Sequence, residues 1–246
     1  VDMDLVNEGA RAERVPMAAA TPFAIRGAFL ATFLNKYAAL PMTMTGTLSN
    51  DAARKRVFET ASFFTATTLP GALDRDGKGF HAAAKVRLMH SMVRFHLMGS
   101  GRWDVATYGI PIPQVDQMPA GTLGTFFLST RVLSKGRTVF TPRERATVEL
   151  ARYRCFLLGL PEDLLGDTPQ EIVDLLTARH VTLREGYDDE ICGSLVRGTL
   201  DVELFDRTTL QGRFPLTEFV LHRPVDELSQ IPGDNHPGAI DGVCPF

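Results

Sequence analysis

The sequence has few of the residues and patterns that mark several common protein classes. Three of its 246 residues are cysteines, Cys155, Cys192 and Cys244, and they are widely spaced. There is no CxxC pair, and no two of the six histidines are spaced for a compact zinc site. An odd number of scattered cysteines argues against a disulfide framework and is compatible with a reducing compartment.

Strong charge and long apolar runs are also missing. The formal net charge of −3 gives no electrostatic reason to expect nucleic acid or an anionic membrane as a partner. No run reaches the length of a transmembrane segment, and no stretch has the pattern of a signal peptide. We therefore expect a soluble protein and favour the cytoplasm, although the chain begins with Val1 and its compartment stays open. Nothing in the sequence points to an oligomeric state.

Motifs of the common enzyme classes are absent. There is no GxGxxG after a strand, no Walker loop, no HExxH, no GxSxG elbow and no Glu-x-x-His pair for a di-iron bundle. Strand patterns are nearly absent too, whereas 44% of the residues are apolar, enough to bury a substantial core. We predict a single all-α domain over residues 1–246, with helices joined by short Pro/Gly turns.

Prolines, glycines and capping residues divide the chain into expected helices. These cover residues 23–34, 51–68, 80–98, 118–133, 142–158 and 169–184. The first should stop between Asn35 and Pro41, and Ser49 or Asn50 should cap the second. Alternate prolines predict an extended segment over 108–116, and capping boxes open the last two helices. Recurrent prolines and glycines predict an irregular extension over 200–246.

The helix expected over 80–98 has an unusual face. At helical spacing, this face holds Ala83, Val86, Arg87, His90, Val93, Arg94 and Leu97. A flat, mostly apolar, doubly anionic cofactor such as haem would suit it, with His90 on the iron and Arg87 and Arg94 on the propionates. The alternative is an ordinary amphipathic helix, with a histidine at the core boundary and arginines that extend to solvent.

The helix expected over 51–68 carries a polar stripe beside an aromatic residue. Arg56, Glu59, Thr60 and Phe63 lie at i, i+3, i+4 and i+7. The stripe is either part of a site or the edge of a helix with a local Glu–Arg ion pair at the surface. By elimination, these two helices are the most site-like pair in the chain.

Together the two stripes resemble the catalytic domain of the rubber oxygenase (latex-clearing protein) family, which also contains fungal oxygenases of the mycophenolic acid pathway. The most specific motifs are R-x-x-E-T-x-x-F over 56–63 and V-R-L-M-H-x-x-V-R over 86–94, within a likeness that covers about residues 45–199. Weaker matches follow over 103–104, 109–116 and 157–165. Because no CxxCH motif occurs, any haem would be non-covalent, of the b type.

The resemblance implies a globin-like all-α domain that binds haem b through His90. Arg56 and Thr60 match a distal-side arginine and threonine of the family, and Glu59 in a dry pocket would be a candidate proton shuttle. We thus predict Arg56, Glu59 and Thr60 as catalytic residues. The residues expected to contact the haem are Arg87, Arg94, Phe63, Val86 and Val93.

The chain departs from the latex-clearing pattern at two positions. Those proteins carry a lysine where this chain has Glu59, and their upstream acidic residue falls near Leu40. We therefore expect a haem-dependent oxygenase that uses dioxygen on a small apolar substrate, isoprenoid or otherwise unsaturated, without committing to polyisoprene. The alternatives are a haem-binding sensor or carrier without turnover, and a helical interaction domain that has lost haem.

Overall fold

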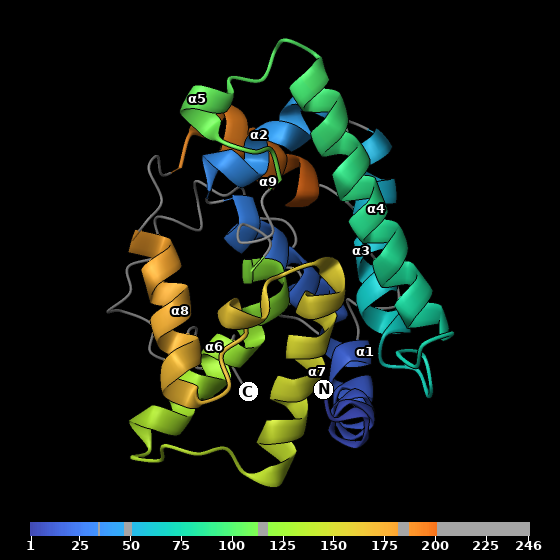
Figure 1. Ribbon diagram of the computed structural model, residues 1–246, viewed down its shortest axis with the longest axis vertical. Helices are drawn as coiled ribbons and strands as arrows, with labels where there is room; N and C mark the ends of the chain where they lie inside the picture. The colour runs from blue at the N-terminus through green and yellow to red at the C-terminus, as the bar shows by residue number, and fades with distance from the viewer. Residues whose placement is uncertain (34, 47–50, 113–117, 182–186, 201–246) are drawn as a thin grey trace, which may run out of the picture.

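The structure, a computed structural model, describes residues 1–33, 35–46, 51–112, 118–181 and 187–200. Within these ranges every regular element is helical, so the all-α prediction is confirmed there (Figure 1). The helices are α1 (Met3–Phe33), α2 (Lys36–Thr45), α3 (Asp51–Ala66), α4 (Lys78–Gly99), α5 (Val105–Tyr108), α6 (Met118–Ser134), α7 (Pro142–Leu158), α8 (Pro169–Val181) and α9 (Ser194–Leu200). A 3₁₀ turn lies at Glu162–Leu164 and a π-helical turn at Asp189–Gly193.

The N-terminal part contains more helix than the sequence predicted. One helix, α1, extends over 31 residues and includes Pro16 and Pro22 within its length. The predicted end of this helix before Asn35 is matched, because α1 ends at Phe33, but the expected break from Asn35 to Pro41 is wrong, because α2 begins at Lys36 and occupies that stretch. Proline lacks the N–H group that a helix interior normally uses, which is why the pattern indicated a break.

Local capping and burial explain why α2 forms in spite of its proline. The side chain of Asn35 accepts a hydrogen bond from the N–H of Tyr37 at 3.0 Å and so caps the first turn. Ala38, Ala39 and Pro41 are buried, and this packing offsets the lost backbone hydrogen bond.

The predicted boundaries of the later helices are closely matched. In the capping box of α7, Glu144 N–H donates to Thr141 Oγ1 at 3.3 Å, and Thr141 N–H donates to Glu144 Oε2 at 2.8 Å. The predicted extended segment is described as far as Ile112, after α5. The Ser49 and Asn50 caps, residues 113–116 and 182–184, and the extension beyond 200 lie outside the described residues.

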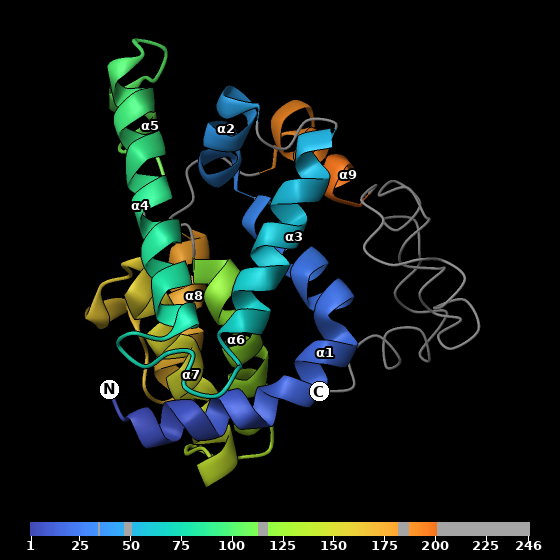
Figure 2. The same cartoon turned by 90° about the vertical axis from the view of Figure 1, so that its right-hand side faces the viewer.

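Helices α1 and α7 pack against each other, and α6 contacts α1, α7 and α8. A side chain at Gly9 of α1 would overlap the carbonyl oxygen of Ala146 in α7, so glycine allows a close approach there. A second group of elements, α2, α3, α9 and part of α4, shares a core around Phe33, Val57 and Phe63 (Figure 2). None of the described helices is long and apolar enough to cross a membrane.

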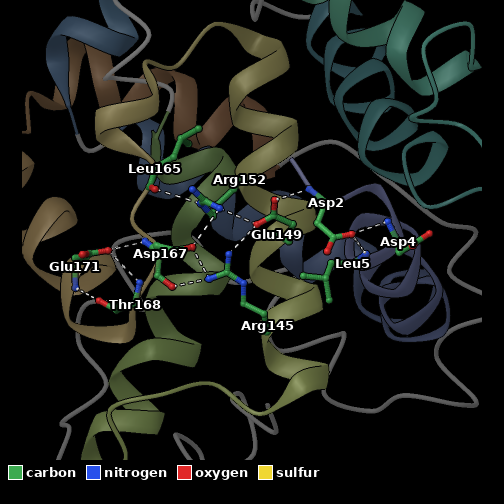
Figure 3. Close-up of polar contacts among 10 residues, drawn as sticks. All are labelled: Asp2, Asp4, Leu5, Arg145, Glu149, Arg152, Leu165, Asp167, Thr168 and Glu171. Carbon is green, nitrogen blue, oxygen red and sulfur yellow. Dashed lines mark hydrogen bonds and ion pairs between the residues drawn. The ribbon is translucent and has the colours of Figure 1, made fainter.

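A buried carboxylate joins α7 to the elements on either side of it (Figure 3). Glu149 accepts hydrogen bonds from Arg145 Nη2 at 3.1 Å and Arg152 Nη1 at 2.7 Å, and both arginines also pair with Asp167. The backbone N–H of Asp2 donates to Glu149 as well, at 3.4 Å. This network holds the start of α1 and the segment before α8 against α7.

Candidate functional site

The imidazole of His90 lies on the inner face of α4, which the buried residues Ala83 and Leu97 define. Within the described part of the chain, no side-chain or backbone group forms a hydrogen bond with this imidazole. Burial, together with the positive charges of Arg56 and Arg94, lowers the pKa of His90 from 6.5 to about 4. At neutral pH the imidazole is therefore uncharged and has a lone pair available for a metal ion.

Arg56 lies on α3, which packs beside α4, and is near enough for its charge to lower the pKa of His90. Its Nη1 atom lies 2.9 Å from Glu59 Oε2. Its Nε atom is buried, and among the described residues it has no hydrogen-bond partner. A buried donor left without a partner costs about 1–3 kcal/mol, so this N–H is a group that a bound ligand could satisfy.

The other two predicted catalytic residues lie nearby on α3 but are engaged differently. Thr60 Oγ1 donates to the carbonyl oxygen of Arg56 at 3.0 Å, a bond within its own helix. The side chain of Glu59 is 46% exposed and pairs with both Arg56 and Lys55. The structure thus places Glu59 in a surface ion pair, the alternative to a dry pocket.

The predicted apolar contacts belong to the interface between α3 and α4. Phe63 is buried in the same core cluster as Ala83, with its ring 5.2 Å from that of Phe64. Val86 packs against this cluster, whereas Val93 is half-buried one turn beyond His90. Val86 and Val93 therefore flank His90 on α4, while Phe63 belongs to the core that α3 and α4 share.

The two arginines predicted to flank a cofactor differ in their surroundings. Arg87 is exposed, and no described residue pairs with its guanidinium. Arg94 Nε donates to the carbonyl oxygen of Pro111 at 3.0 Å, and its Nη2 donates to that of Ile112 at 2.6 Å. Arg94 therefore holds the segment after α5 against α4, a contact that the sequence analysis missed.

The backbone at this contact is unusual. Ile112 has a φ of 50°, the only positive value at a non-glycine residue in the described ranges. A β-branched residue rarely adopts this conformation, and the bond from Arg94 holds it there. The sequence signal for the contact was the proline on each side of Ile112, which restricts the chain without revealing its partner.

A surface groove of about 510 Å³ lies elsewhere, between residues 163–166 and α8. Its lining includes Asp163, Glu171 and Asp174 but none of the predicted site residues. The described His, Cys, Asp and Glu residues contain no group of three that could hold a metal ion.

Residues 16–214 match the family described as ER-bound oxygenase mpaB/B'/rubber oxygenase, catalytic domain. The chain belongs to this family. The structure is similar to that of a latex clearing protein, LCP, in the closed state, with a TM-score of 0.63 and 18% sequence identity over 95% of this chain. That likeness shows a shared helical fold, and this chain spans 63% of the length of that protein. No curated protein matches the chain.

For a member of the rubber oxygenase family, the cofactor to test against this site is haem. The residues present fit it on two counts: the neutral imidazole of His90 has no partner among the described residues, and neither has the buried Nε of Arg56. Arg94 fits less directly, because its guanidinium is bound to the backbone at Pro111 and Ile112. These residues would offer haem one histidine ligand, one charged hydrogen-bond donor and an apolar surface.

Proposed function

We propose that this chain is the haem b-binding catalytic domain of an oxygenase, with His90 as the protein ligand to iron. The observation that carries the proposal is the neutral imidazole of His90, which lies without a partner among the described residues and close to Arg56. Haem held there would supply the activation of dioxygen. The family match supports the same reaction class.

The residues around His90 have separate roles in this proposal. Arg56 is a permanent cation whose buried Nε faces no described acceptor, so it would donate a hydrogen bond to a bound ligand. Glu59 would keep Arg56 in place through their 2.9 Å ion pair. The hydroxyl of Thr60 would accept or pass on a proton beside Arg56.

The remaining predicted residues would hold the cofactor. Phe63, Val86 and Val93 would supply apolar surface for the cofactor. Arg87 and Arg94 would stay close to its carboxylates, with Arg94 also positioning the Pro111–Ile112 segment. The substrate we propose is a small apolar molecule, isoprenoid or otherwise unsaturated, since the structural neighbour is a latex clearing protein.

A second candidate function is a haem-binding sensor or carrier without turnover. Two observations favour it: Leu40 stands where the family's acidic residue is expected, and Glu59 is ion-paired and about half exposed. The two functions share the haem site and differ in whether a substrate is consumed.

The test begins with the absorption spectrum of the purified chain, reconstituted with haem if necessary. We expect a Soret band that His90→Ala abolishes and His96→Ala leaves intact, because His96 lies on the same helix but is exposed. Full haem occupancy in His90→Ala would overturn the ligand assignment.

Turnover separates the two functions. The haem-loaded chain is incubated with dioxygen, a reductant and an acyclic isoprenoid such as squalene, and carbonyl products are sought by mass spectrometry. Products that disappear in His90→Ala support the oxygenase. Haem binding without products on any unsaturated substrate tested supports the sensor or carrier.

A further inference from the structure

The outer face of α4 carries a stripe of exposed apolar side chains. Leu88, Met92 and Phe95 are 61%, 64% and 84% exposed. Their spacing of i, i+4 and i+7 places them on one side of the helix, away from His90. Isolated exposed apolar residues are common, but three that line up along one helix form a surface able to bind an apolar partner.

No described element covers this stripe. Helix α4 lies at an outer edge of the molecule in both views, and α3 and α7, the helices it packs against, lie toward the interior (Figures 1 and 2). The buried residues of the helix, Gly79, Ala83 and Leu97, all face those partners.

Positive charge accompanies the stripe. The 22 residues of α4 contain four Lys or Arg residues and no Asp or Glu. Two of the cations, Lys78 and Lys85, are exposed and lie together along one edge of the apolar stripe. In a chain whose formal net charge is −3, this is a local concentration of one sign. The nearest carboxylates along the chain, Asp76 and Asp104, lie outside the helix at its two ends.

We propose that the outer face of α4 is a docking surface for an anionic lipid bilayer. Leu88, Met92 and Phe95 enter the boundary between headgroups and acyl chains, while the cations beside them contact the phosphates. Long Lys side chains suit this position because their stems are apolar and only their ends are charged.

A second copy of the chain fits this surface less well. A symmetric dimer through α4 would bury the apolar stripes but would bring two helices without carboxylates face to face, and like charges repel. An anionic bilayer satisfies both the apolar stripe and the charge. The proposal does not depend on haem, since it concerns the face opposite His90.

Vesicle co-sedimentation tests the apolar part. We expect the chain to bind vesicles of phosphatidylcholine with about 30% phosphatidylserine, and Phe95→Ser to lower the partition coefficient about tenfold by losing one buried aromatic ring. The matched control is Val139→Ser, which removes an apolar residue of 69% exposure outside α4 and should bind as the parent does. Thermal unfolding of all the proteins confirms that they are folded.

A charge reversal tests the electrostatic part. Lys85→Glu should weaken binding to the same vesicles about tenfold or more, whereas Lys135→Glu, an exposed lysine at the end of α6, should not. Equal binding to vesicles of phosphatidylcholine alone would overturn the proposal. It would also fail if the chain ignored vesicles and instead formed a dimer that Phe95→Ser dissociates.

Discussion

The charge of a single imidazole, that of His90, sets the chemistry of the inner face of α4. Burial and two nearby guanidinium groups lower the pKa of His90 to about 4, so the imidazole is uncharged at any higher pH. Burying the imidazole in this way costs free energy, because it loses hydration and gains no hydrogen bond from a described residue in return. A neutral imidazole of this kind suits a metal that is already bound by other donors, as iron is by the porphyrin nitrogens of haem.

Arg94 should contribute more to stability than Arg87, although the sequence treats them as equivalent neighbours of His90. Arg94→Ala removes two charge-assisted hydrogen bonds to the carbonyls of Pro111 and Ile112, which are buried. We expect it to lower the free energy of unfolding by about 2–4 kcal/mol, and Arg87→Ala to change it by less than about 0.5 kcal/mol. Urea denaturation of both variants measures the difference.

The same two variants separate stability from cofactor binding. If both arginines hold haem carboxylates, each variant should lose haem about ten- to a hundredfold more readily than the parent while it is still folded. Arg94→Lys, which keeps the charge but not the fork of donors, should recover only part of the stability. A stable Arg94→Ala protein would contradict the backbone contact.

At the scale of the helices, local signals were predictable from the sequence and long-range contacts were not. The capping box at Thr141 and Glu144 and the end of α4 at Gly99 depend on residues close together in the chain. The helix through Pro41 depends on burial supplied by elements far away in sequence. The contact from Arg94 to Ile112 spans 18 residues and leaves no periodic pattern in the sequence. The sequence therefore predicted which site residues share a helix face, but not which segments contact that face.

The N-terminus of α7 should show a defined dependence on pH. The guanidinium of Arg137 and the hydrogen bonds from Thr141 lower the pKa of Glu144 from 4.5 to about 2. A carboxylate whose pKa is lower in the folded state stabilises the protein above pH 4.5, and this contribution disappears as the pH falls through about 2.

Glu144→Gln isolates this ion pair, because glutamine can still accept the capping hydrogen bond from Thr141 N–H. We expect the variant to be about 1–2 kcal/mol less stable than the parent near neutral pH, with allowance for partial exposure, and equally stable near pH 2. Urea denaturation across this range gives the curve. A difference that stays constant with pH would mean that the capping bond, and not the charge, had been lost.

The stability of the whole molecule depends on the close packing of α1 against α7. Gly9→Ala adds a methyl group that would overlap the Ala146 carbonyl, so we expect a loss of about 1–3 kcal/mol even though alanine favours helices. Gly27→Ala is the matched control in the same helix: its added Cβ meets nothing within 4 Å, and it should stabilise the protein by about 0.5–1 kcal/mol. Thermal and urea denaturation measure both. Equal effects at the two glycines would contradict the close contact.

A single buried arginine connects the N-terminal helix, the helix of Arg56 and the central helix α7. Arg154 Nη1 lies 2.7 Å from Glu13 Oε2 in α1, and its Nε donates to Thr67 Oγ1 at 2.8 Å, just after α3. Replacing both partners of a buried ion pair by apolar residues often changes stability little. Removing only one partner is costly, because it leaves a buried charge uncompensated. The arginine thus sets where α3, and with it Arg56, stands relative to α7.

We therefore expect Arg154→Met to lower the free energy of unfolding by about 3–5 kcal/mol, because the Glu13 carboxylate and the Thr67 hydroxyl lose their partner. The double variant Glu13→Met with Arg154→Met should be less destabilised than the sum of the two single variants by about 1–3 kcal/mol. Urea denaturation of all four proteins completes the double-mutant cycle. Additive effects would show that the two side chains do not interact in solution.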